Sequence, residues 1–270
     1  MTLLQALIFA LIQGISELFP VSSVAHGVLT PYVLGWNLDP VFLKEHFLPF
    51  VVMLHLGTAT ALLVFFRAEW LGILGSLRAS GGRRKLMLIV CGTLPAAVLG
   101  FLFEKNLRHI FSNVTIAAFF LIVNGLLLYW GEKIRAKGVK DLEDLGYGQA
   151  LIIGLFQSLA LVPGFSRSGA SITAGFWMGL RHEAAARFSM MLATPIIFGA
   201  AVLEIPKLVL ADVGPLLYTS MLGGLAAGLA AFASVWVLMR WFKRNEFNAM
   251  LPFAVYCALL GGTVLFLRLS

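Results

Sequence analysis

The stretch "LPFVVMLHLGTATALLVFF", residues 48–66, contains no Asp, Glu, Lys or Arg and is almost entirely apolar. A helix that crosses a bilayer needs about 20 mainly apolar residues, so this stretch has the length of one span. The run "MLGGLAAGLAAFASVWVLM", residues 221–239, has the same character. A transmembrane β-strand would instead alternate apolar and polar residues over about 10 positions. These solid runs therefore predict helices that cross a membrane.

The composition of the whole chain extends this prediction. Of its 270 residues, 60% are hydrophobic and only 12% are charged, whereas a soluble domain carries about 25% charged residues. We expect an all-α polytopic membrane protein with a single integral membrane domain over residues 1–270. The net charge of +7 then reflects topology, and we expect the membrane, not nucleic acid, as partner. Cys91 and Cys257 both fall in apolar segments and are expected to be packed core residues.

Basic residues are distributed unevenly between the loops that connect the apolar segments. Most of the 20 Lys and Arg residues lie in four loops, 67–85, 132–146, 181–187 and 240–249. The remaining loops, 37–46, 104–114 and 204–216, hold only Lys44, Lys105, Arg108 and Lys207. Since cytoplasmic loops carry the excess of Lys and Arg, the first four loops are predicted to be cytoplasmic. Between the loops we predict six uninterrupted spans, at 47–66, 86–103, 115–131, 188–203, 217–239 and 250–267.

Two further apolar regions, 2–36 and 147–180, are interrupted by Gly, Pro and Ser. Region 147–180 begins and ends next to cytoplasmic loops, so it must cross twice or dip into the membrane and return. Each half of the chain, about 1–135 and 145–270, then has one broken re-entrant hairpin plus three transmembrane helices. The halves have opposite orientation, which makes an inverted-topology repeat with a polar site near the midplane. The N-terminus is external if 2–36 is re-entrant.

The two broken hairpins resemble each other in sequence. The first reads "IQGISELFPVSSVAHG" (12–27) and the second reads "FQSLALVPGFSRSGAS" (156–171), each with Gln, then Pro, then a Ser-rich turn. Proline ends a helix, and glycine permits unusual backbone angles. A chain broken at membrane depth is tolerated only where it is buried in protein or lines a wet cavity. The two breaks are therefore expected to meet around one site.

Two charged residues fall inside these apolar regions. Glu17 is the only acid within an apolar segment, and Arg167 is the only base in either hairpin. A charge at membrane depth costs about 2.5–3.5 kcal/mol on insertion scales, so such residues indicate a functional site by default. The planar fork of Arg167 fits phosphate oxygens, and Ser166 and Ser168 add hydroxyls beside it. This combination suits phosphoryl chemistry.

The first hairpin offers the groups that would act on a bound phosphate. Ser23 or His26 could be the nucleophile, and Glu17 could be a base, an orienting group or a metal ligand. Structural interpretations stay open: small polar residues often only pack membrane helices, and Glu17 with Arg167 could form a purely structural ion pair. His26 could be a core histidine. His55, inside a predicted span, is ambiguous, and His182, in a predicted loop, carries no special signal.

The segments "GISELFPVSSVAH" (14–26) and "LVPGFSRSGASITAG" (161–175) resemble the two signature stretches of the BacA-type undecaprenyl-diphosphatases. The likeness covers nearly the whole chain. It implies hydrolysis of undecaprenyl diphosphate to undecaprenyl phosphate and phosphate, which recycles the lipid carrier for cell-wall synthesis and gives bacitracin resistance. It also implies a multi-pass protein of the bacterial cytoplasmic (inner) membrane, an active site that faces the periplasm, and dependence on Mg or Ca.

The resemblance also assigns roles to residues. Glu17 matches the second acid of the family's E-G-x-x-E-x-x-P signature, and Ser23 and His26 match the Ser and His that follow it. Ser166 and Arg167 match the S-R of P-G-x-S-R-S-G. The expected catalytic residues are Glu17, Ser23, His26 and Arg167, with Gln13, Ser166, Arg167 and Ser168 binding phosphate and Glu17 available to a metal.

One departure from the signature concerns the first acid, which is Gln13 in this chain. Glutamine keeps the size of Glu but loses its charge, so affinity for a cation should fall if both acids bind it. This departure keeps a second function open, a flippase or transporter of polyprenyl phosphate, since transporters also use inverted repeats. A transporter should survive loss of Ser23 and His26, whereas a phosphatase should not. The sequence does not fix the oligomeric state, and a homodimer is one option.

Overall fold

The structure is a computed structural model of the full chain, and it describes residues 1–38, 42, 46–78, 80–110, 113–134, 138–210, 214–245 and 247–269. Helices account for most of this described part. Their bounds are α1 Leu3–Ser16, α2 Ser23–Val33, α3 Phe47–Phe65, α4 Arg67–Gly75, α5 Ser80–Ile110, α6 Val114–Lys133, α7 Tyr147–Gln157, α8 Arg167–Trp177, α9 His182–Leu210, α10 Gly214–Arg244 and α11 Leu251–Leu269. Two short 3₁₀ turns, η2 Leu142–Asp144 and η3 Ser158–Leu161, join them.

The prediction of a polytopic all-α membrane protein is confirmed. Within the described residues, five helices are long and apolar enough to cross a membrane, and the bent pair α3–α4 raises the number to six. All six predicted spans coincide with helices, namely α3, α5, α6, α9, α10 and α11. Many of their large apolar side chains are exposed, as lipid-facing surfaces are in a membrane protein.

The predicted loops are shorter in the structure than in the sequence analysis. Loop 67–85 contains α4, which turns by 69° from α3 at the single residue Phe66. The prediction that residues 67–75 belong to a loop was wrong. The charged residues Arg67 and Glu69 interrupt the apolar run without interrupting the helical conformation. Helices α5 and α10 likewise run on into the predicted loops 104–114 and 240–249. Parts of the predicted loops, including Lys44, Arg135 and Lys137, lie outside the described residues.

Both regions predicted to be broken are broken hairpins in the structure. In the first, the Val21 N–H donates to the Phe19 carbonyl at 2.7 Å across Pro20, and Ser22 takes a φ of 67° before its side chain caps α2. In the second, Pro163 and Gly164 lie between η3 and α8. Gly164 has a φ of 111°, and a Cβ there would lie 2.5 Å from the Phe120 Cβ. Only glycine fits both the backbone angle and the close contact with α6.

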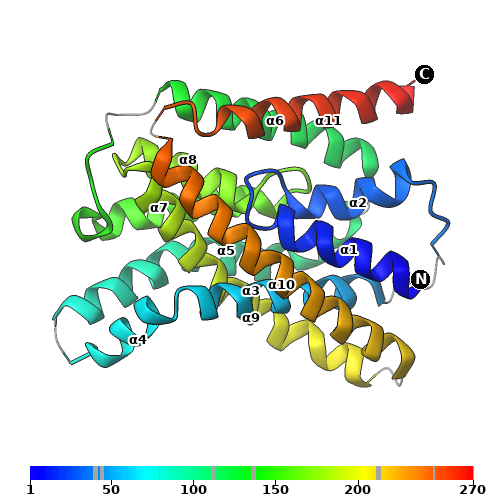
Figure 1. Cartoon of the computed structure of the whole chain (residues 1–270), viewed down its shortest axis with the longest axis horizontal. Coiled ribbons are helices and arrows are strands. Elements are labelled where there is room, and N and C mark those ends of the chain that lie inside the picture. The colour runs from blue at the N-terminus through cyan, green and yellow to red at the C-terminus, as the bar shows by residue number, and fades with distance from the viewer. Residues whose placement is uncertain are drawn as a thin grey trace.

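The helices are arranged so that the two hairpins approach from opposite ends of the molecule (Figure 1). Both chain termini lie at one end with α1 and α2, and α4 and α7 lie toward the other. Helix α1 packs on α10, and α7 packs on α5; α3 packs on α9 and α10, and α6 packs on α11. The order of elements, a hairpin followed by three long helices, occurs twice. The division into halves of about 1–135 and 145–270 in opposite orientation agrees with this order and stays a prediction.

A buried ionic cluster fixes the end of the molecule opposite the termini. His182, predicted to lie in a loop without a role, is only 3% exposed, and its Nε2 lies 3.2 Å from each carboxylate oxygen of Glu132. The same carboxylate accepts the backbone N–H groups of Asn248 and Met250, just before α11. Glu132 therefore ties α6, α9 and the start of α11 together, with its negative charge at a helix N-terminus.

Candidate active site

The two hairpin breaks meet at the side chain of Glu17, which follows the last residue of α1 and is 6% exposed. Its Oε2 accepts three contacts: Gln13 Nε2 at 3.1 Å, Ser23 Oγ at 2.6 Å and His55 Nε2 at 3.2 Å. Its Oε1 faces the Nε and Nη2 of Arg167, both at 3.3 Å. The ion pair of Glu17 with Arg167, which the sequence left open as a structural interpretation, is thus present in the structure.

Arg167 is held on both sides of its guanidinium. Its Nη1 donates to the Ser189 carbonyl of α9 at 3.0 Å, opposite the contacts to Glu17. Ser189 is linked in turn to α8, because Ser171 Oγ donates to Ser189 Oγ at 2.7 Å. The arginine remains 11% exposed. A bound anion can therefore reach a guanidinium whose direction is already fixed.

Ser23 and Arg167 occupy equivalent positions in the two hairpins. Each is the first residue of its helix, after a serine that caps the helix: Ser22 in the first hairpin and Ser166 in the second. The N-terminal ends of α2 and α8 thus both lie at Glu17. Free N–H groups and the positive end of the helix dipole favour an anion at such a position.

His55 is a site residue that the sequence analysis left ambiguous. Its Nδ1 lies 2.8 Å from the Val51 carbonyl, which can only accept, so Nδ1 carries a proton. Its Nε2 faces Oε2 of Glu17, whose other oxygen is paired with Arg167 and which is therefore an ionised acceptor. Both ring nitrogens are thus placed to donate, which is the arrangement that an imidazolium makes. A histidine inside an apolar span was the signal for it in the sequence.

Asn124 of α6 is a second residue that sequence reasoning missed. Its Nδ2 donates to the Pro20 carbonyl at 3.1 Å, and its Oδ1 accepts the Ser166 N–H at 3.0 Å. One fully buried amide thus joins the break of one hairpin to the break of the other. A lone Asn in a membrane helix carries no spacing pattern, so only the folded chain identifies its role.

We expect Asn124→Ala to destabilise the protein because it leaves the buried Ser166 N–H unpaired and the Pro20 carbonyl with only the long contact from Cys257 Sγ at 3.9 Å. A buried group left unpaired costs about 1–3 kcal/mol. Thermal unfolding of the detergent-solubilised protein measures the loss. Asn113→Ala is the matched control, since the Asn113 side chain caps the same helix by accepting the Ile116 N–H. An Asn124 variant that unfolds no earlier than the control would contradict the bridging role.

Ser166 and Ser168, predicted to bind phosphate, are 2% and 0% exposed. Their hydroxyls lie 3.0 Å apart, the Ser166 hydroxyl accepts the Gly169 N–H, and the Ser168 hydroxyl donates to the Phe19 carbonyl at 3.2 Å. In this structure the two serines connect the hairpins and cap α8. Their contact with phosphate stays a prediction.

His26 faces away from the other predicted catalytic groups. Its Nδ1 lies 2.7 Å from the Ser22 carbonyl, and its Nε2 lies 2.7 Å from the Tyr256 hydroxyl of α11. The two rings are stacked, with centroids 5.7 Å apart. The structure thus brings Gln13, Glu17, Ser23 and Arg167 together, whereas the ring of His26 is held between α2 and α11.

The divalent cation implied by the resemblance does not fit these donors well. Mg²⁺ and Ca²⁺ are held mainly by carboxylate and other oxygens. Both oxygens of the Glu17 carboxylate are already engaged, by five donor atoms on four side chains, and two of these side chains, His55 and Arg167, are basic. No cluster of three or more His, Cys, Asp or Glu suited to a metal occurs among the residues that the structure describes. To bind the ion, Glu17 would have to give up its contacts with His55 and Arg167.

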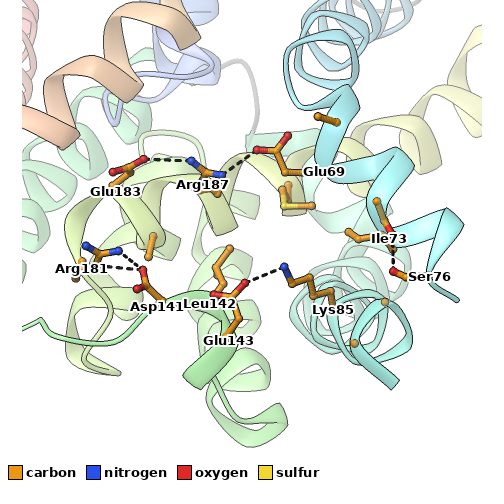
Figure 2. A pocket seen from close by; sticks show the side chains of 16 residues that line it. Glu69, Ile73, Ser76, Lys85, Asp141, Leu142, Glu143, Arg181, Glu183 and Arg187 are labelled. Atoms are coloured by element: carbon orange, nitrogen blue, oxygen red, sulfur yellow. Dashed lines mark hydrogen bonds and ion pairs between the residues drawn. The ribbon is translucent and has the colours of Figure 1, made fainter. Parts of the chain in front are cut away.

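A second polar region lies at the end near α4, where Figure 2 shows a cavity of about 720 Å³. Its charged groups are paired with one another: Arg187 lies 2.9 Å from Glu69 and 3.1 Å from Glu183, and Lys85 lies 2.8 Å from Glu143. The hydrogen bond from Lys85 lowers the pKa of Glu143. None of the predicted site residues lines this cavity. Its ion pairs connect α4, α5, α9 and the segment before α7.

Comparison with known proteins identifies the family to which the resemblance of the signature residues pointed. The sequence model described as "Bacitracin resistance protein BacA" matches residues 6–263. A protein of Oenococcus oeni named undecaprenyl-diphosphatase 2 is 56% identical over 266 residues, which covers 98% of each chain. Another of the same name, from Chromobacterium violaceum, is 48% identical over all of both chains. An undecaprenyl-diphosphatase of Acidiphilium cryptum is 46% identical, over 99% of this chain and 98% of its own. The chain therefore belongs to the BacA family of bacitracin resistance proteins.

Proposed function

We propose that this chain hydrolyses undecaprenyl diphosphate to undecaprenyl phosphate and inorganic phosphate, and so recycles a lipid carrier and protects against bacitracin. The observation that carries this proposal is the meeting of Ser23 and Arg167, from opposite hairpins, on one carboxylate. A nucleophile, its proton acceptor and a phosphate-binding fork lie within one site. The relatives at 56% and 48% identity carry the name of this activity.

In the proposed reaction, Arg167 and the N-terminal ends of α2 and α8 bind the diphosphate. The Ser23 oxygen attacks the terminal phosphorus, and its proton passes to Oε2 of Glu17, 2.6 Å away. The bond from phosphorus to the bridging oxygen breaks, and undecaprenyl phosphate leaves with that oxygen. Water then attacks the phosphorus of the phosphoserine, the bond from phosphorus to the Ser23 oxygen breaks, and the proton held by Glu17 returns to that oxygen, which releases phosphate and restores Ser23 and the Glu17 carboxylate. Enzymes catalyse such transfers mainly by positioning and charge stabilisation, so Glu17 need not be a strong base.

Between the two candidate nucleophiles, the contacts favour Ser23. Its hydroxyl donates to the carboxylate that faces Arg167. His26 has both ring nitrogens engaged, by the Ser22 carbonyl and the Tyr256 hydroxyl. In the proposal His26 sets the position of α2 against α11, and so the position of Ser23 at the start of the same helix.

The proposal places the protein in the bacterial cytoplasmic membrane with its site open to the periplasm. It is supported by the basic loops near α4 and α7, which mark the cytoplasmic end. Both termini lie at the opposite end (Figure 1), which is then the periplasmic end. A homodimer belongs to the same proposal. Mass measurement of the purified protein in detergent tests it, and a strictly monomeric mass would exclude it.

The test of the function is phosphate release from undecaprenyl diphosphate by the purified protein in detergent. We expect multiple turnovers with the wild-type chain and none with Glu17→Gln, which keeps the side-chain shape but cannot accept the proton. Equal release by both proteins, or none from the wild type in any divalent cation or in EDTA, would overturn the proposal.

A second function, transport of polyprenyl phosphate across the membrane, is favoured by the approach of the hairpins from opposite ends (Figure 1). A transporter needs the phosphate-binding Arg167 but no nucleophile. Proteoliposomes that contain Ser23→Ala separate the two functions. Lipid phosphate that still reaches the opposite leaflet would support transport, and loss of both transport and hydrolysis would argue against it.

A further inference from the structure

The Glu17 carboxylate is surrounded by an excess of positive charge. Glu17 caps the C-terminus of α1, where the helix dipole disfavours an acid. Arg167 at one oxygen and the imidazolium of His55 at the other compensate it. One negative and two positive side chains leave the site with net positive charge before any ligand binds.

Gln13 contributes to the same balance by being uncharged. Its Nε2 donates to Oε2 of Glu17 at 3.1 Å. A Glu at this position, as in the signature that the sequence otherwise follows, could not donate there. Its charge would lie next to that of Glu17, and two adjacent carboxylates repel each other unless a cation lies between them. Gln13 removes this repulsion and with it the need for an ion.

The position of His55 is fixed by the helix that carries it. The imidazole is anchored by Val51 one turn earlier on α3 and is 18% exposed. Two residues further on, α3 touches α10 so closely that a Cβ on Gly57 would overlap the Gly224 carbonyl. His55 thus presents its Nε2 to the site from a tightly packed helix, with part of its side chain exposed.

We propose that His55 and Gln13 together replace a protein-held divalent cation in this chain, with His55 as the second positive charge, beside Arg167, that neutralises the substrate's diphosphate. The inference rests on the proposed function for the identity of that substrate. Its content is separate: this site binds and acts on a diphosphate without first binding a metal ion.

The first test measures direct binding of Mn²⁺ to the lipid-free protein in detergent, with electron paramagnetic resonance as the readout. We expect no stoichiometric binding by the wild type. We expect binding by the double variant Gln13→Glu/His55→Gln, which adds an acid beside Glu17 and removes the competing cation. Tight stoichiometric binding of Mn²⁺ by the wild type would overturn the inference without reference to activity.

The second test is phosphate release in EDTA compared with Mg²⁺ or Ca²⁺. The wild type should keep most of its activity in EDTA, and His55→Gln should lose about 100-fold, the usual effect of removing one charge-stabilising donor. The double variant should be active only with an added divalent cation. Wild-type activity that disappears in EDTA and returns with Mg²⁺ would contradict the inference.

His182→Gln is the matched control, because His182 also pairs with a buried Glu but lies outside the site. It should lower thermal stability without changing the response to EDTA. If the wild type releases no phosphate under any condition, the proposed function fails, and Mn²⁺ binding still decides whether His55 and Gln13 exclude an ion.

Discussion

Arg167→Ala should reduce phosphate release from undecaprenyl diphosphate by about 10³- to 10⁵-fold, the range found when an arginine that stabilises a transferring phosphoryl group is removed. Arg167 is the guanidinium at the site, and its fork is fixed by Glu17 and the Ser189 carbonyl. Alanine removes the fork and also leaves Glu17 with a single cationic partner, His55. Both effects weaken binding of an anion at the site.

Arg167→Lys separates charge from geometry. Lysine keeps the positive charge but cannot donate to Glu17 and the Ser189 carbonyl from one planar group, and it does not match phosphate oxygens in pairs. We expect Lys to restore less than a tenth of wild-type activity. Because breaking a buried ion pair can cost about 3–5 kcal/mol, thermal unfolding of both variants must accompany the assay. A folded Arg167→Ala protein that turns over within tenfold of the wild type would refute the assigned role.

Much of the fold was predictable because lipid imposes simple requirements on a sequence. A span must be long, apolar and helical, so the six spans could be located from apolar runs alone. The two breaks could be located from Pro20, Pro163 and Gly164, whose backbone preferences act locally. Helix α4 was missed because charge ends a span without ending a helix, and hydropathy measures only the span.

The site was predictable in the members that the two hairpin breaks supply, with Gln13 and Ser23 found beside Glu17 as expected. Glu17 and Arg167 stand out because an ionisable group in an apolar segment is costly. His55 and Asn124 are defined by partners far away in the chain: Glu17 for the first, and both Pro20 and Ser166 for the second. No spacing rule within a helix encodes such contacts. His26 was predicted as the alternative nucleophile to Ser23, yet its ring contacts Tyr256, a partner 230 residues away in the chain.

Ser23→Ala should lower phosphate release by at least about 10³-fold, since removing a nucleophile disables the acting group as a whole. The hydroxyl contributes little to the fold beyond one hydrogen bond to Glu17, so the variant should unfold close to the wild-type temperature. Ser22→Ala is the matched control. Ser22 is the neighbouring hydroxyl, and it accepts the Ala25 N–H as the cap of α2 rather than contacting Glu17. Ser22→Ala should lower the free energy of unfolding by about 1 kcal/mol and should change the rate of phosphate release little.

The chemistry of the trapped intermediate distinguishes Ser23 from His26 more sharply than activities do. His26→Gln also disturbs the contact of α2 with α11, so a slow His26 variant alone would not identify the nucleophile. Phosphoserine survives acid and is cleaved by alkali, whereas phosphohistidine is lost in acid. Rapid acid quenching with substrate labelled in its terminal phosphate should leave label on the wild type and on slow His26→Gln, and none on Ser23→Ala. Label that is lost in acid, or label that persists in Ser23→Ala, would show that a group other than Ser23 is the nucleophile. Glu17 would then orient the site rather than accept the proton of the nucleophile.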